Sequence, residues 1–122
     1  MPTLRQRHGT LAEDAALAYL EGLGWRLIER NVKVGRDEID IVAVDPGPPA
    51  ELVFVEVRSA TSSAFGTPEE RIGRVKVGHL YRAMRGYRPN EGSGLVRRVD
   101  LVVVDSRSGS AVIRYLRALE LP

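Results

Sequence analysis

Helix-like and strand-like segments follow one another along the chain in an order typical of an α/β protein. Apolar residues at helical spacing predict a first helix over residues 11–21. Thr10 can cap this helix, and Glu13, three residues on, completes a capping box. Gly22 and Gly24 then end it.

Five further segments have the composition of strands, because β-branched and apolar residues alternate with polar ones or form dense runs. They cover residues 25–34, 38–44, 52–58, 96–104 and 111–116. In the third of these, a period of two puts Glu56 and Arg58 on one face. Both faces are otherwise mostly apolar, so we expect this strand to be central. The proline-rich segment 45–50 predicts a hairpin before it.

A second helix is predicted from the segment that begins with Thr67 and Pro68 and continues to about Tyr87. Its apolar residues share one face and its basic residues another. The apolar set is Ile72, Val75, Leu80, Ala83, Met84 and Tyr87, and the other face carries Arg71, Arg74, Gly78, Arg82 and Arg85.

Composition limits the class of protein. A chain of 122 residues with 43% hydrophobic content is long enough for one core, so we expect one domain over residues 1–122. There is no cysteine, so any metal would have oxygen or imidazole ligands. No apolar run approaches the roughly 18 residues of a membrane span. We therefore expect a cytoplasmic protein without a membrane partner.

The basic residues are distributed unevenly, although the formal net charge is only +2. Between residues 71 and 98 there are eight bases and one acid. The bases are Arg71, Arg74, Lys76, Arg82, Arg85, Arg88, Arg97 and Arg98. A locally basic surface attracts phosphate backbones, but a solvated helix face in an arginine-rich chain would look the same.

Two acids lie inside apolar strands, where an ionised side chain is costly to bury. Asp40 lies in the second strand and Glu56 in the third. If these strands pair through the hairpin, the two carboxylates can approach one another across the ladder. Mg²⁺ is usually held by one or two carboxylates, with water and substrate phosphate as the other ligands. The alternative is that the acids only form ion pairs with nearby arginines such as Arg58.

Lys76 and Glu13 are further candidates, each with a structural alternative. Lys76 shares the helical row of Ile72 and Leu80, so we expect it to lean toward the core. It could serve the site as a compact ammonium, or it could extend past the apolar edge into solvent. Glu13 could be a third carboxylate of the site instead of part of a capping box.

Several motifs in succession resemble a known family. They are HGTLAEDAALAYLEGLGW, IERN, DEIDIVAV, LVFVEVR, FGTPEE and RRVDLVVVD. In this order they resemble the YraN-like family of uncharacterised bacterial proteins over nearly the whole chain. That family is assigned by similarity to the PD-(D/E)XK nuclease superfamily, akin to restriction enzymes and Holliday junction resolvases. The resemblance implies a single nuclease-like domain with a restriction-endonuclease-like core, in which helices flank a mixed sheet of about five strands.

The resemblance also implies roles for particular residues. Asp40 matches the metal-binding aspartate of the superfamily, and Glu56 matches the acid of its Glu-x-Lys motif. The backbone carbonyl of Val57 would be a further metal ligand, and Glu13 matches a helical acid often found beside that site. Lys76 falls where the family pattern has a lysine in the following helix.

The chain departs from the pattern at two positions. Asp37 stands where the family usually has glycine, which affects only the turn. Arg58 stands where the catalytic lysine of the superfamily belongs. Arginine stays protonated, so it can stabilise developing negative charge but cannot shuttle a proton.

Two functions follow as hypotheses. The first is a hydrolase, a Mg²⁺- or Mn²⁺-dependent endonuclease that cleaves branched or single-stranded DNA at a site of Asp40, Glu56, Arg58 and Lys76. Its nucleic-acid contacts would come from Arg71, Arg74, Arg82, Arg85, Arg97 and Arg98. The second is an inactive module of the same fold that binds nucleic acid or a protein. Resolvase-like relatives often form dimers, so a homodimer stays open.

Overall fold

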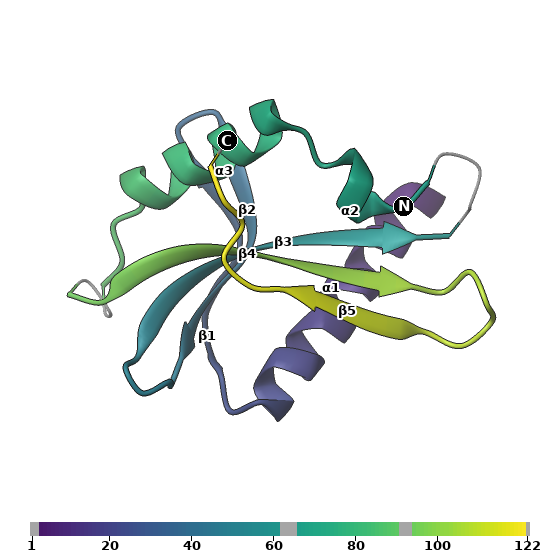
Figure 1. Ribbon diagram of the computed structural model, residues 1–122, viewed down its shortest axis with the longest axis horizontal. Coiled ribbons are helices and arrows are strands. Elements are labelled where there is room, and N and C mark those ends of the chain that lie inside the picture. The colour runs from purple at the N-terminus through teal and green to yellow at the C-terminus, as the bar shows by residue number, and fades with distance from the viewer. Residues whose placement is uncertain (1–2, 62–65, 91–93, 122) are drawn as a thin grey trace.

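The computed structural model describes residues 3–61, 66–90 and 94–121. Within these ranges the chain forms helices and strands in a mixed order (Figure 1). The helices are α1 (Leu4–Gly22), α2 (Pro68–Arg71) and α3 (Arg74–Gly86). The strands are β1 (Arg26–Val34), β2 (Asp37–Asp45), β3 (Glu51–Ala60), β4 (Val96–Asp105) and β5 (Val112–Leu116). None of the helices in the described ranges is long and apolar enough to cross a bilayer.

The strands form one five-stranded mixed sheet in the order β1-β2-β3-β4-β5. Three neighbouring pairs are antiparallel, and β3 runs parallel to β4. The parallel pair needs a crossover, and the segment that contains α2 and α3 provides it. The predicted mixed α and β architecture, the hairpin between β2 and β3 and the central position of β3 are therefore confirmed.

The sheet is covered on both faces, with α1 on one side and α3 on the other (Figure 1). In β3 the alternation follows the prediction. Val53 and Val55 pack in the core that includes α1, whereas Leu52 and Phe54 pack in the core that includes α3. Each of these four side chains is fully buried.

The predicted start of the first helix is wrong. Helix α1 begins at Leu4, so Thr10 lies inside it and cannot cap it. Arginine, glutamine and leucine favour helix, and one internal glycine such as Gly9 costs only about 1 kcal/mol. Glu13 therefore lies in the middle of a helix, and the capping box does not explain its presence.

The predicted second helix is two helices. Thr67 caps α2 by accepting a hydrogen bond from the backbone N–H of Glu70 at 3.3 Å, as predicted. The chain then becomes extended at Ile72, and α3 begins after Gly73. This break changes the helical phase, so Val75, predicted to face the core, is 68% exposed. The buried positions of α3 are Val77, Leu80 and Ala83.

Candidate active site

Asp40 and Glu56 meet where the backbone ladder between β2 and β3 ends. The last backbone pair of that ladder is Ile41 with Val55, and the next pair in the same register would be Asp40 with Glu56. The two carboxyl groups lie close enough to interact, since the charge of Glu56 is one of the causes that raise the pKa of Asp40. Asp40 Oδ2 also accepts the backbone N–H of Val57 at 2.7 Å. The structure thus brings the two predicted acids together.

The environment of Asp40 favours its neutral form. Burial, and then the charge of Glu56, raises the pKa of Asp40 to about 8, while the hydrogen bond from the N–H of Val57 opposes the rise. The Asp40 carboxyl therefore keeps its proton to a higher pH than an ordinary aspartate does, and a protonated carboxyl can donate to a neighbouring carboxylate. A shared proton is one way to hold two buried carboxylates together, and a cation is the other.

Two cations reach the same oxygen of Glu56. Its Oε2 accepts a hydrogen bond from Arg58 Nε at 2.9 Å and lies 3.6 Å from Lys76 Nζ. The Glu56 side chain is only 7% exposed, whereas those of Arg58 and Lys76 are 34% and 37% exposed. Lys76 comes from α3, so its predicted inward row does bring it to the sheet. Two strands and one helix therefore contribute to one cluster of acids and cations.

Glu13 lies beside this cluster on α1. Its charge contributes to the raised pKa of Asp40, and burial raises the pKa of Glu13 itself while Arg30 opposes the rise. The distance from Arg30 Nη2 to the Glu13 carboxylate is 3.8 Å, longer than the 2.8 Å from the same atom to Asp14. Glu13 Oε1 is buried and has no hydrogen-bond partner among the described residues.

The donor set fits a magnesium-type ion held by two carboxylates. Among the described residues, no three acidic or histidine side chains converge to hold a metal by themselves, so Glu13 does not form a third ligand in this conformation. In a strand, the N–H and C=O of one residue point to the same edge. The carbonyl of Val57 therefore faces the edge where its N–H binds Asp40. Two carboxylates and one carbonyl leave room for water and phosphate, which Mg²⁺ retains.

The six arginines predicted to bind nucleic acid differ in their availability. Arg71, Arg74 and Arg85 are exposed, and within the described ranges no acid forms an ion pair with them. Arg82 instead donates two hydrogen bonds of 2.7 Å to Asp37. This fork explains the acid at position 37, since the Arg82 guanidinium holds the pKa of Asp37 below its usual range.

Arg97 is used inside the fold. Its Nη1 donates to the backbone carbonyls of Met84 and Tyr87, at 2.6 Å and 2.8 Å. Carbonyls at the end of a helix lack partners within it, so Arg97 satisfies the C-terminal end of α3. The guanidinium also lies 5.8 Å from the centre of the Phe54 ring.

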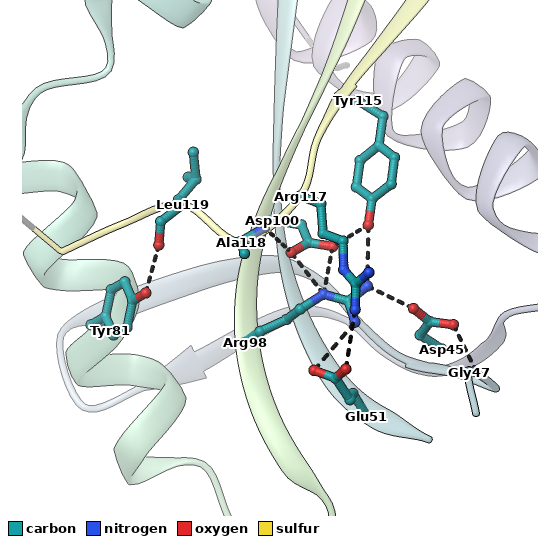
Figure 2. Close-up of polar contacts among 10 residues, drawn as sticks. All are labelled: Asp45, Gly47, Glu51, Tyr81, Arg98, Asp100, Tyr115, Arg117, Ala118 and Leu119. Carbon is teal, nitrogen blue, oxygen red and sulfur yellow. Dashed lines mark hydrogen bonds and ion pairs between the residues drawn. The ribbon is translucent and has the colours of Figure 1, made fainter. Parts of the chain in front are cut away.

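Arg98 is buried among acids, at 7% exposure (Figure 2). It contacts Asp45 at 2.7 Å, Asp100 at 3.1 Å and Glu51 at 3.3 Å. Its Nη2 also donates to the Tyr115 hydroxyl. Arg98 thus joins β2, β3, β4 and β5 instead of lying on a surface that nucleic acid could reach.

The C-terminal segment is fixed beside this network (Figure 2). The backbone N–H of Ala118 donates to Asp100 at 2.9 Å, and Ala118 itself has a positive φ of 58°. The next residue, Leu119, accepts a hydrogen bond from Tyr81 of α3 at 2.5 Å. The segment therefore ties α3, the helix that carries Lys76, to the sheet.

Sequence reasoning missed Arg30 and Asp100. Arg30 lies on the exposed edge strand β1, and only the packing of α1 brings it to Glu13. Asp100 was visible as an acid inside an apolar strand, two residues from Arg98. That spacing puts both side chains on one face of β4, so the buried pair could have been proposed.

Comparison with known proteins gives a family. A model of the uncharacterised protein family UPF0102 matches residues 12–104. The chain is 39% identical over 115 residues to a UPF0102 protein of Pseudarthrobacter chlorophenolicus, covering 93% of this chain and 83% of the relative. It is 40% identical over 105 residues to one of Moorella thermoacetica, covering 85% of each.

A more distant relative from Deinococcus radiodurans is 31% identical over 121 residues, which cover 95% of this chain and 97% of the relative. The similarity thus extends over nearly the full length of both proteins. Asp40, Glu56 and Lys76 lie within the matched segment of the family model. The chain belongs to the UPF0102 family.

Proposed function

We propose that this protein is a metal-dependent phosphodiesterase that hydrolyses nucleic acid at the Asp40–Glu56 pair. The observation that supports this most directly is the meeting of two acids at a strand edge, with Arg58 and Lys76 on the same carboxylate oxygen. Acids that approach so closely in a largely buried place cost stability, and such costs are commonly kept for function. The resemblance to the PD-(D/E)XK superfamily implies the same site.

In this proposal Asp40, Glu56 and the carbonyl of Val57 hold one divalent ion. The ion would supply Lewis acidity toward the scissile phosphate and lower the pKa of a bound water. Arg58 and Lys76 would stabilise the negative charge that develops on the phosphate. Because arginine does not release its proton, any proton transfer falls to Lys76 or to water.

Nucleic acid would bind through the exposed arginines of α2 and α3, which are Arg71, Arg74 and Arg85. Contacts of this kind go to the phosphate backbone and carry little sequence information. We therefore expect weak sequence preference and an affinity that falls steeply with salt. DNA, branched or single-stranded, is the substrate class that we propose.

The test compares the wild type with Asp40→Asn on single-stranded, duplex and four-way-junction DNA, with Mg²⁺, Mn²⁺ or EDTA. Glu21→Gln is the matched control, because it removes one charge at an exposed position near the end of α1. We expect metal-dependent cleavage by the wild type and the control, and a loss of at least about 100-fold in Asp40→Asn. Equal cleavage by all three proteins would reject the site.

A second candidate is a nucleic-acid-binding module of the same fold without turnover. Arg58 favours it, because an arginine stands at the position of the motif lysine and already forms an ion pair with Glu56. Arg58→Lys separates the two functions. A gain of cleavage in this variant indicates a weakened nuclease, whereas salt-sensitive binding without cleavage in both proteins indicates a binding module.

A further inference from the structure

The charge of Glu56 is already compensated in the structure. Its Oε2 accepts a hydrogen bond from Arg58 Nε at 2.9 Å and lies 3.6 Å from Lys76 Nζ. With a side chain only 7% exposed, it has little other access to solvent. A divalent cation that approaches Glu56 therefore meets two positive charges beside the carboxylate that would bind it.

Arg58 and Lys76 have freedom that Glu56 lacks. Their side chains are 34% and 37% exposed, so each is buried along part of its length and open to water elsewhere. Both have long, flexible stems whose charged ends can turn toward solvent. Among the described residues, Glu56 is the one acid with which either cation forms an ion pair. A phosphate group at the site could therefore take both cations from the same carboxylate.

We propose that Arg58 and Lys76 couple metal binding to nucleic-acid binding. They hold Glu56 while the site is free, and a phosphodiester anion draws them away so that Glu56 can bind a divalent ion. The site then binds metal strongly only together with nucleic acid. This inference rests on the proposed function, because it assigns Glu56 to the metal.

Thermodynamic linkage gives the expected size of the effect. If nucleic acid raises the affinity for metal by some factor, metal raises the affinity for nucleic acid by the same factor. Coupling between two sites typically amounts to about 5-fold to 150-fold. We expect an increase of about tenfold or more here, because two cations change partners. Removing either cation should tighten metal binding in the absence of nucleic acid.

The experiment measures Mn²⁺ binding by the EPR signal of free Mn²⁺, with and without phosphorothioate DNA, which keeps the backbone charge and resists hydrolysis. Asp40→Asn measured in parallel corrects for ions condensed on the DNA. We expect the wild type to bind Mn²⁺ about tenfold more tightly with DNA. Arg58→Gln and Lys76→Gln should bind it more tightly than wild type when DNA is absent, and DNA should then add less.

Arg85→Gln is the control for charge. Residue 85 lies nine positions after Lys76 on α3, about 13 Å along the helix, and its exposed side chain pairs with no described acid. This variant should weaken DNA binding but leave Mn²⁺ binding without DNA unchanged. Circular dichroism confirms that each variant is folded.

The outcomes separate this inference from the proposed function. Micromolar Mn²⁺ binding that depends on Asp40 and does not change with DNA would overturn the coupling while the metal site stands. No Mn²⁺ binding that depends on Asp40, with or without DNA, would overturn both. Unchanged Mn²⁺ affinity in Arg58→Gln and Lys76→Gln would show that these cations do not compete with the ion, and would also overturn the coupling.

Discussion

Replacing Arg98 with methionine should lower the free energy of unfolding strongly, because Arg98 is a buried partner of several ion pairs and not a surface residue. The guanidinium contacts three acids, of which Asp100 is fully buried and Glu51 is also paired with Arg117. Removing one partner of a buried ion pair typically costs about 3–5 kcal/mol, because the other charge is left uncompensated. Methionine keeps much of the side-chain volume, so the loss reports mainly on the charge. We therefore expect Arg98→Met to lower the free energy of unfolding by about 3 kcal/mol or more.

The assay is urea unfolding followed by circular dichroism, with a double-mutant cycle that includes Asp100→Asn. The asparagine carbonyl can still accept the hydrogen bond from the Ala118 N–H, and the amide NH2 at the other position can donate to the Tyr115 hydroxyl. With the acid neutralised, Arg98→Met should cost about 1–3 kcal/mol less than it does in the wild type. Arg85→Met is the matched control and should stay within about 0.5 kcal/mol of wild type. A loss below about 1 kcal/mol in Arg98→Met, or purely additive effects in the cycle, would refute this account of the network.

Four further predictions concern single residues of the candidate site, the core and the basic surface. The first concerns pH, measured in EDTA. Because the pKa of Asp40 is raised, the native state keeps a proton that the unfolded chain loses above pH 3.8. The free energy of unfolding should therefore fall from about pH 4 to about pH 8. Unfolding measured at both ends of this range should show that fall in the wild type, by at most about 1.4 kcal/mol for each pH unit from Asp40. The fall should be smaller in Asp40→Asn, where Glu13, whose pKa is also raised, still contributes. Tyr81→Phe should cost about 1 kcal/mol in urea unfolding, because the carbonyl of Leu119 loses its donor. Val77→Ala should lower the unfolding free energy by about 1–2 kcal/mol, whereas Val75→Ala on the exposed side of α3 should stay within about 0.5 kcal/mol. If Arg85 contacts a phosphate, Arg85→Gln should reduce the slope of log affinity against log salt by about 0.9 in fluorescence anisotropy with duplex DNA, and an unchanged slope would place Arg85 outside the interface.

The sheet could be predicted from the sequence because its signals are local. Alternation in β3 and the proline-rich loop before it determine which residues face which side and how the hairpin is registered. The meeting of Asp40 and Glu56 follows from these two features. The helix boundaries were harder. A glycine can lie within a helix, as Gly9 does in α1, or just before one, as Gly73 does before α3. The local sequence does not distinguish these two cases.

The roles of the arginines depend on tertiary packing and could not be predicted in the same way. Arg82 and Arg85 are both basic residues of α3. Arg82 is paired with Asp37, whereas Arg85 is exposed. Arg97 and Arg98 are adjacent in the chain and point to opposite faces of β4, one toward the end of α3 and the other into the acidic network. A run of bases in a sequence thus gives the charge of a region but not the number of charges available to a ligand.

Asp40 has a structural role besides its proposed role as a metal ligand, and two substitutions can separate these roles. The backbone ladder between β2 and β3 stops at Ile41 and Val55, although β3 continues to Ala60. Beyond that point the Asp40 side chain, and not a backbone carbonyl, accepts the N–H of Val57. Asparagine can accept the same hydrogen bond and cannot carry the negative charge, whereas alanine would lose both. Asp40→Asn therefore tests the charge alone. One outcome is that Asp40→Ala unfolds easily while Asp40→Asn is stable but binds no Mn²⁺. In that case the Asp40 carboxylate both accepts the N–H of Val57 and binds the ion. If Asp40→Asn binds Mn²⁺ as well as the wild type does, Asp40 is not a metal ligand, and its role is to accept the hydrogen bond from the N–H of Val57.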